Sequence, residues 1–155
     1  MYSIRKILVP VDFSDYSKKA LNFAVDFAVT NKAKLYLVYV VEPLIYPADF
    51  SMGQVNIPSI DNDLTERAKS ELEMLIKNEI AGKVDSEALI KSGKPFVEII
   101  ETASEKDIDL IIIATHGHTG VEHLLFGSTA EKVVRKAPCP VLTIREPIKG
   151  FKFKA

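Results

Sequence analysis

The chain has 155 residues, of which 47% are hydrophobic and 26% charged, and this composition excludes a disordered protein. A net charge of −1 lacks the basic excess of nucleic-acid-binding proteins, so we expect no nucleic-acid partner. The single cysteine, Cys139, fits a reducing compartment, and neither a signal peptide pattern nor an apolar run long enough for a membrane span is present. We therefore expect a cytoplasmic protein with one domain over residues 1–155 and no membrane partner.

Five short apolar runs alternate with segments in which apolar residues recur with the 3.6-residue period of a helix. We expect strands at residues 7–11, 35–41, 86–90, 110–114 and 141–144, with a helix between each pair of strands. Runs that are apolar at nearly every position are typical of a parallel sheet covered on both faces. The alternation therefore predicts an α/β fold, a three-layer doubly wound five-stranded parallel sheet with the common strand order 3-2-1-4-5.

One long connection interrupts this alternation. Residues 44–60 follow the second expected strand and contain Pro47, Gly53 and Pro58, so we expect a flexible loop there. Because the loop leaves the carboxyl end of a strand, it should hang over the edge of the sheet where ligands bind. Two interpretations stay open, a segment that contacts a ligand and an insertion that does not.

The ligand crevice of such a sheet lies beyond the carboxyl ends of the strands, at the point where the strand order reverses. For the order 3-2-1-4-5 this point lies between the first and fourth strands. Asp12 follows the first strand, and its carboxylate could bind a ribose hydroxyl or help to hold a metal. On its own, the sequence Asp12-Phe13-Ser14 is somewhat better explained as a turn that caps a helix.

The segment 114–129, after the fourth expected strand, is rich in glycine, serine and threonine and leads into a helix. Glycine lets backbone N–H groups approach a phosphate, and a helix N-terminus presents unpaired N–H groups and the positive end of the helix dipole. Gly127, Ser128 and Thr129 stand where that helix should begin. The segment therefore indicates an anion site, with an ordinary glycine turn and serine cap as the alternative.

Better-known phosphate fingerprints and catalytic patterns do not occur in the sequence. Neither G-x-x-x-x-G-K-[ST] nor G-x-G-x-x-G is found in the context it needs, which argues against a Walker-type NTPase and a standard dinucleotide-binding domain. No G-x-S-x-G elbow occurs, and lysine and arginine are missing between Ala114 and Glu131. We therefore expect no catalytic residue and, at most, slow ATP hydrolysis.

Three histidines, His116, His118 and His123, lie close together in the same segment. We interpret them as loop histidines near phosphates rather than as a zinc site, which needs several converging ligands with an oriented surrounding shell. We expect no metal site formed by the protein alone. Mg²⁺ or Mn²⁺ would instead come with the phosphates of a nucleotide, with Asp12 as a candidate ligand.

At this point the chain resembles a known family. Gly117, nine further residues and then Gly127-Ser128 match the second part of the pattern G-x-x-G, nine residues, G-[ST], which ATP-binding universal stress proteins carry after the fourth strand. The sequences ILVPVDFS at 7–14, YVVE at 39–42 and PCPVL at 138–142 also resemble this family. The resemblance runs from Ile4 to Arg145 and implies the adenine nucleotide alpha hydrolase-like version of the fold.

The resemblance also implies roles for individual residues. Adenosine would contact Pro10, Val11, Asp12 and Val40, with Asp12 near the ribose and the Val40 backbone at the adenine. The phosphates would contact Ala114, Thr115, His116, Gly117, His118, Thr119, Gly127, Ser128 and Thr129. Ala114 replaces the first glycine of the family pattern, and at a position that needs a positive φ it would cost stability or displace the loop.

The resemblance implies that the protein binds ATP and acts as a nucleotide-dependent regulator in a stress response. AMP or ADP stays open as the ligand. It further implies a homodimer formed through the last strand, Val141 to Arg145, and an unidentified protein partner. Three alternatives remain. One is a slow ATP hydrolase or phosphotransferase, and a second is a partner-binding module of the same fold that has lost nucleotide binding, for which Ala114 is the only sequence feature. The third, ranked last, is an α/β domain that uses a flavin or forms an adenylate.

Overall fold

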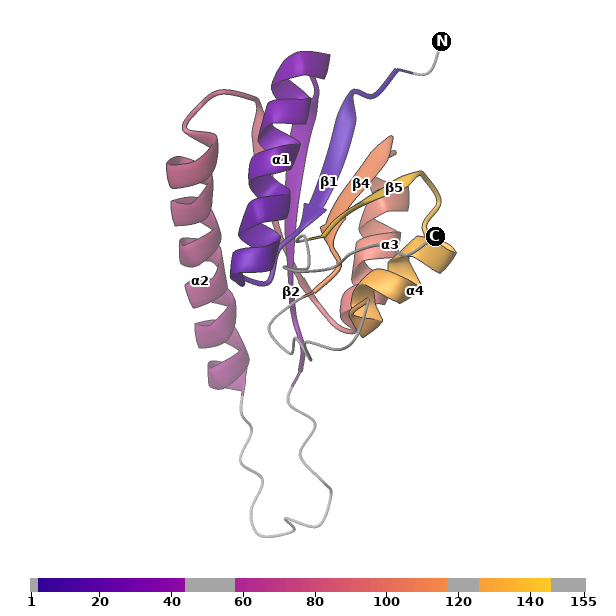
Figure 1. The fold of residues 1–155 in the computed structure, drawn as a ribbon. Helices are drawn as coiled ribbons and strands as arrows, with labels where there is room; N and C mark the ends of the chain where they lie inside the picture. The colour runs from indigo at the N-terminus through magenta and orange to yellow at the C-terminus, as the bar shows by residue number, and fades with distance from the viewer. Residues whose placement is uncertain (1–2, 44–57, 117–125, 146–155) are drawn as a thin grey trace, which may run out of the picture.

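In the computed structural model, which describes residues 3–43, 58–116 and 126–145, strands and helices alternate along the chain (Figure 1). A short π-helical turn, η1, extends the second helix. The elements are β1 (Lys6–Pro10), α1 (Asp15–Asn31), β2 (Lys34–Val41), α2 (Pro58–Leu75), η1 (Ile76–Ile80), β3 (Ser86–Ser92), α3 (Pro95–Glu105), β4 (Leu110–Ala114), α4 (Ser128–Lys136) and β5 (Val141–Ile144).

The five strands form one sheet in the order β3-β2-β1-β4-β5, and all four neighbouring pairs are parallel. This confirms the predicted fold class and strand order. β1 lies in the middle of the sheet, with β2 on one side and β4 on the other (Figure 1). The strand order reverses between β1 and β4, because the chain first moves outward through β2 and β3 and then returns past β1 to β4 and β5.

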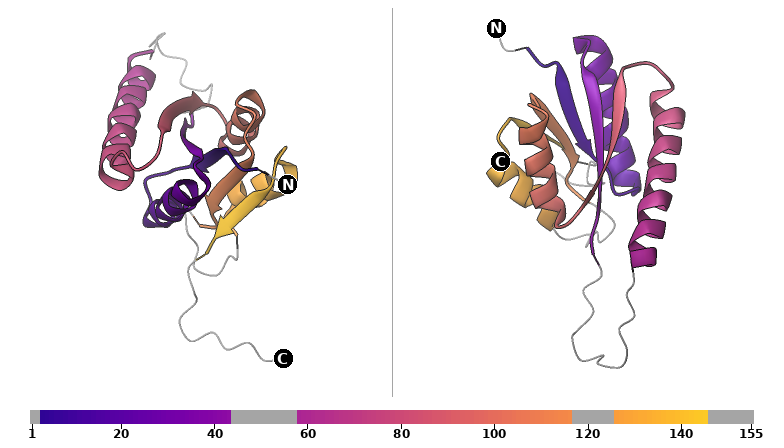
Figure 2. Two further views of the ribbon diagram at one scale, coloured as in Figure 1. Left: turned by 90° about the horizontal axis from the view of Figure 1, so that it is seen from above. Right: turned by 180° about the vertical axis from the view of Figure 1, so that it is seen from behind.

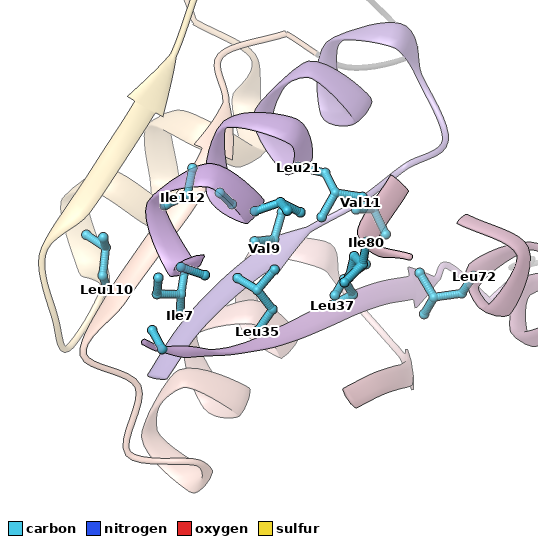
Figure 3. Close-up of a cluster of buried hydrophobic side chains, with 14 residues drawn as sticks. Ile7, Val9, Val11, Leu21, Leu35, Leu37, Leu72, Ile80, Leu110 and Ile112 are labelled. Atoms are coloured by element: carbon cyan, nitrogen blue, oxygen red, sulfur yellow. The ribbon is translucent and has the colours of Figure 1, made fainter. Parts of the chain in front are cut away.

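Two apolar layers hold the helices against the sheet. α1 and α2 cover one face and α3 and α4 cover the other (Figure 2). Successive strand residues face opposite sides, so Ile7 and Val9 of β1 pack under α1, whereas Leu8 packs on the α3 and α4 side. All three side chains are fully buried. Figure 3 shows the first layer, in which Leu21 of α1 meets strand side chains from β1 and β2.

The segment predicted as a flexible loop, 44–60, is described only at its end. Residues 44–57 lie outside the described residues, and α2 begins at Pro58. The expectation that the loop extends to Ile60 is therefore wrong by three residues. Proline is well suited to the first helical position, because its φ is already helical and its missing N–H would have no partner there. No helix in the described part of the chain is long and apolar enough to cross a membrane.

A cluster of charges joins the elements at the edge of the sheet where β2 and β3 begin. The Glu87 carboxylate accepts a hydrogen bond from Lys106 Nζ at 2.8 Å and lies 3.1 Å from Lys34 Nζ. Two hydrogen bonds lower the pKa of Glu87, and the one from Lys106 has a larger effect than the one from Lys34. Both ammonium groups also lie near the face of the Tyr36 ring. The cluster ties β2, β3 and the end of α3 together, at the edge opposite the carboxyl ends of the strands.

Thr102 of α3 offers a test of the second apolar layer. The residue is fully buried, and its hydroxyl has no hydrogen-bond partner among the described residues. We expect Thr102→Val to raise the free energy of unfolding by about 1 kcal/mol, because it replaces an unpaired buried hydroxyl with a methyl group. Thr102→Ser keeps the hydroxyl and loses the methyl group, so it should lower stability by about 1 kcal/mol. Urea denaturation measures both, and a less stable Thr102→Val protein would contradict the expectation.

Candidate functional site

A cavity of about 310 Å³ opens at the carboxyl ends of β1, β2 and β4, where the strand order reverses. The first turns of α3 and α4 also line it. The reversal creates the opening, because the connections after β1 and β4 leave toward opposite faces of the sheet. Ten of the thirteen residues selected from the sequence line this cavity, namely Pro10, Val11, Asp12, Val40, Ala114, Thr115, His116, Gly127, Ser128 and Thr129.

The other three selected residues, Gly117, His118 and Thr119, lie outside the described residues. The same holds for His123 of the histidine group. The structure therefore brings ten predicted residues together around one cavity, and whether any of the thirteen contacts a ligand stays a prediction. Within the described residues, no group of three histidine, cysteine, aspartate or glutamate side chains could hold a metal ion.

Asp12 takes part in the turn that starts α1. Its Oδ1 accepts hydrogen bonds from the Ser14 backbone N–H at 3.0 Å and from the Ser14 hydroxyl. Ser14 in turn caps α1, because its Oγ accepts the backbone N–H of Ser17 at 3.2 Å. The capping interpretation of this segment is thus correct, and Asp12 also lines the cavity. The turn fixes one carboxylate oxygen and so sets the orientation of the whole group.

Phe13, between Asp12 and Ser14, adopts a backbone conformation that is uncommon for a bulky residue. Its φ is 62°, in the left-handed region, which costs energy for a residue with a large side chain. Its ring packs against Tyr39, with the ring centroids 4.8 Å apart. Burial, assisted by the charges of Glu71, Asp12 and Glu42, raises the pKa of Tyr39. Tyr39 lines the cavity, and the Phe13 ring packs against it.

The backbone of Thr115 connects the end of β4 to β5 and to the start of α4. Its backbone N–H donates to the Ile144 carbonyl of β5 at 3.0 Å, and its carbonyl accepts the N–H of Gly127. A Cβ at Gly127 would lie 3.2 Å from that same carbonyl oxygen. The absent side chain at Gly127 therefore leaves room for two backbone segments to approach closely, whereas its φ of −66° requires no glycine. The Gly127 N–H is used within the protein, which differs from a role as a direct phosphate donor.

The N-terminus of α4 faces the cavity with the donors that an anion would use. Gly127 is the N-cap and has no capping side chain, and Ser128 and Thr129 form the first helical turn. The first N–H groups of a helix lack partners within the helix and carry the positive end of its dipole. The predicted helix start is confirmed. The donors that the start of α4 can offer to an anion are the N–H groups and hydroxyls of Ser128 and Thr129, because the N–H of Gly127 is already bonded to Thr115.

His116 is the last described residue before the segment 117–125. Its Nδ1 lies 3.0 Å from the hydroxyl of Thr115, and its ring packs against Tyr16 of α1 with the centroids 5.5 Å apart. These contacts hold the imidazole at the α1 side of the cavity, which His116 lines.

Ala114 does not strain the backbone. It is the last residue of β4, pairs with Ile144 of β5, and is not among the residues with a positive φ. The cost considered for an alanine at a position that needs a positive φ therefore does not arise. The alanine methyl group fits an extended strand as well as any other small side chain does.

The end of the cavity away from α4 is apolar, and of its residues only Val40 was selected from the sequence. Its walls include Val38 of β2, Pro95 and Ile99 of α3, and Ile113 of β4. Val38 could have been found, because it lies two residues before Val40 and so faces the same side of the sheet. The α3 residues could not, because their position depends on how α3 packs across β2. The remaining missed lining residues are Ser17, Tyr39, Glu42 and Ala130.

A tight turn brings α3 to this end of the cavity. Gly93 has a φ of 150°, and its N–H donates to the Val41 carbonyl at the end of β2 at 3.0 Å. L side chains rarely adopt this φ, so glycine suits the turn, and a Cβ here would also crowd the Glu98 side chain. Pro95 then begins the helix beside Val40.

The charges around the cavity are unevenly distributed. Asp12 and Glu42 are acidic, and no lysine or arginine is found among the described residues that line it. Attraction for an anion in this part of the site therefore comes from the α4 N-terminus, and a highly charged anion would need a cation to accompany it.

Comparison with known proteins identifies the family. The model of the universal stress protein family matches residues 3–145, and the chain therefore belongs to this family. The chain is 37% identical over 150 residues to universal stress protein MJ0531 of Methanocaldococcus jannaschii, covering 94% of this chain and 84% of that protein.

Solved structures agree with this assignment. The universal stress protein UspA from Lactobacillus plantarum has a TM-score of 0.74 and 30% identity, over 92% of this chain and 99% of that one. The universal stress protein from Archaeoglobus fulgidus in complex with dAMP has a TM-score of 0.62 over 92% of this chain and 98% of that one. At 22% identity, the second likeness concerns the fold alone.

The junction between Thr115 and Gly127 can be tested by one added methyl group. We expect Gly127→Ala to lower the free energy of unfolding by about 1 kcal/mol, because the new Cβ crowds the Thr115 carbonyl and alanine is a poor N-cap. Ser128→Ala is the matched control. It adds no Cβ and alters an exposed side chain, so stability should change by no more than a few tenths of a kcal/mol. Equal losses in both variants, measured by urea denaturation, would contradict the crowding argument.

Proposed function

We propose that this universal stress protein binds an adenine nucleotide, with ATP as the first candidate and AMP and ADP as the others. The observation that carries the proposal is a cavity with apolar walls at one end and the N-terminus of α4 at the other, which we call the anion-binding end because its N–H groups suit a phosphate. The apolar end lies between β2 and α3, and the anion-binding end is the N-terminus of α4 beyond β4. Since β2 and β4 flank β1, their ends are two strand spacings apart, about 10 Å. This separation suits a nucleoside with phosphates on one side.

The apolar end supports the binding of a flat base. Val38 and Val40 form one wall, and Pro95 and Ile99 form the facing wall. Binding pockets for small molecules are generally lined by such apolar residues, with a few polar groups that fix the orientation of the ligand. Asp12, which the turn before α1 holds in place, is the polar group beside the middle of the cavity and would accept a hydrogen bond from a ribose hydroxyl.

The anion-binding end supports the binding of phosphates. The N–H groups at the start of α4 and the hydroxyls of Ser128 and Thr129 are donors of the kind that hold phosphates at helix N-termini. Because the described lining contains carboxylates and no lysine or arginine, we propose that Mg²⁺ or Mn²⁺ accompanies the phosphates. Asp12 is the lining residue best suited to approach such an ion, directly or through water.

The function we propose is nucleotide-dependent regulation in a stress response rather than catalysis. Phosphoryl transfer needs a base that orients the nucleophile and cations that stabilise the transferred group. The described lining residues include no lysine or arginine that could stabilise the transferred group. A bound nucleotide would then act by stabilising one state of the protein, which a protein partner recognises. The Archaeoglobus fulgidus protein of the same fold was solved with dAMP, but the proposal for this chain rests on its own residues.

We also propose that the protein forms a homodimer through Val141 to Arg145. β5 is an edge strand, and its four residues are only partly buried. Pairing with a second copy along this edge would satisfy backbone groups that have no neighbouring strand within the described sheet. It would also cover Leu142 and Ile144, which face the α1 side.

Thr129 allows the anion-binding end to be tested without unfolding the helix. We expect Thr129→Glu to weaken ATP binding at least tenfold relative to Thr129→Gln, because a carboxylate at the α4 N-terminus repels phosphates. The same carboxylate is favourable near a helix N-terminus, so the fold should be retained. Isothermal titration calorimetry with Mg²⁺ measures both affinities, and the loss should be smaller for AMP, which carries less charge.

Two results would count against the proposed function. One is a wild-type protein that binds none of ATP, ADP and AMP at millimolar concentration. The other is equal ATP affinity in the Glu and Gln variants, because the phosphates would then lie elsewhere.

The dimer makes a separate prediction. Thr143 lies in the middle of β5, and a lysine on an edge strand opposes pairing between sheets. We expect wild-type protein to have the mass of a dimer in sedimentation analysis and Thr143→Lys to have that of a monomer. A wild-type monomer at high protein concentration would contradict the proposed interface.

A further inference from the structure

Glu42 is a charged residue of the cavity lining to which the proposed function assigns no role. It follows directly after β2, which ends at Val41. Side chains alternate along a strand, and Tyr36, Val38 and Val40 all pack on the α3 side of the sheet. Glu42 continues this series and stands at the rim of the apolar end, beyond Val40.

The oxygens of the Glu42 carboxylate can accept hydrogen bonds from a ligand. The side chain is exposed, and within the described part of the chain it forms no ion pair or hydrogen bond. An ionised carboxylate can only accept hydrogen bonds, so a ligand group that meets it must be a donor. The phosphates cannot be that group, because the α4 N-terminus lies about two strand spacings, or about 10 Å, from the end of β2.

We propose that Glu42 is a specificity-determining residue, whose carboxylate accepts a hydrogen bond from the exocyclic amine of the bound base. This inference rests on the proposed nucleotide binding and names the class of base that the site prefers. The carboxylate selects a purine with an amine at its outer edge, as in adenine, over one with a carbonyl oxygen there, as in hypoxanthine.

The carboxylate favours adenine in two ways, because it attracts the amine of adenine and repels the carbonyl oxygen of hypoxanthine. With ITP in the site, a carbonyl oxygen would face the carboxylate, and two acceptors would meet without a proton between them. ATP and ITP carry the same ribose and the same triphosphate. The ratio of their affinities therefore reports on the edge of the base and cancels any general effect of charge on phosphate binding.

The test compares the ATP and ITP affinities of wild-type protein with those of Glu42→Gln, by calorimetry with Mg²⁺. Glutamine keeps the shape of the side chain but can both donate and accept, so it suits either base. We expect wild-type protein to prefer ATP by about tenfold, which is the lower range for a hydrogen bond to a charged group at an exposed rim. In Glu42→Gln the ratio should fall to near one, mainly because ITP binds more tightly.

Glu71→Gln is the matched control. Glu71 is an exposed carboxylate of α2 whose charge also acts on Tyr39, but it does not line the cavity. The control removes the same charge near the site, and its ATP to ITP ratio should equal that of wild type. Equal unfolding temperatures of the three proteins would show that the fold is unchanged.

The outcomes separate this inference from the function on which it rests. If wild-type protein binds neither nucleotide, the proposed function fails. If it binds ATP but binds ITP equally well, or if Glu42→Gln keeps the wild-type ratio, nucleotide binding stands and the role of Glu42 is overturned. A ratio that falls in Glu42→Gln and not in Glu71→Gln supports the role.

Discussion

The parallel pairing of β1 with β2 on one side and with β4 on the other is the constraint on which the rest of the structure depends. β1 is buried on both faces, so its neighbours must arrive through crossovers that place helices above and below the sheet. The connection after β1 leads to α1 on one face, and the connection after β4 leads to α4 on the other. The cavity is the space that these diverging connections leave between them.

How much could be predicted depends on how local each feature is. The strands, the cap at Ser14 and the start of α4 follow from residues a few positions apart, and the structure agrees with them. Ten residues of the site could be selected in advance because each lies close to the end of a strand or the start of a helix at the reversal point. Ile99 could not, since it reaches the cavity only because Gly93 turns the chain and α3 then packs across β2.

Gly127 lines the cavity, but its backbone N–H has a different role from the one the sequence suggested. The sequence suggested a glycine that exposes its N–H to a phosphate. Its N–H instead donates to the Thr115 carbonyl, and the missing side chain allows that carbonyl to approach. Thr115 also binds the end of β5 through its own N–H, so one residue joins the edge strand, the central part of the sheet and the helix that faces the cavity. Such non-local backbone contacts leave no periodic signal in a sequence.

The charge cluster of Lys34, Glu87 and Lys106 lies at the edge of the sheet opposite the cavity. The ion pairs that join β2, β3 and the end of α3 and the side chains that line the cavity are thus held at different ends of the sheet. None of these three residues lines the cavity, so the two sets of side chains do not overlap. The cavity walls can therefore vary in sequence without removing the ion pairs that join the strands at the other end of the sheet.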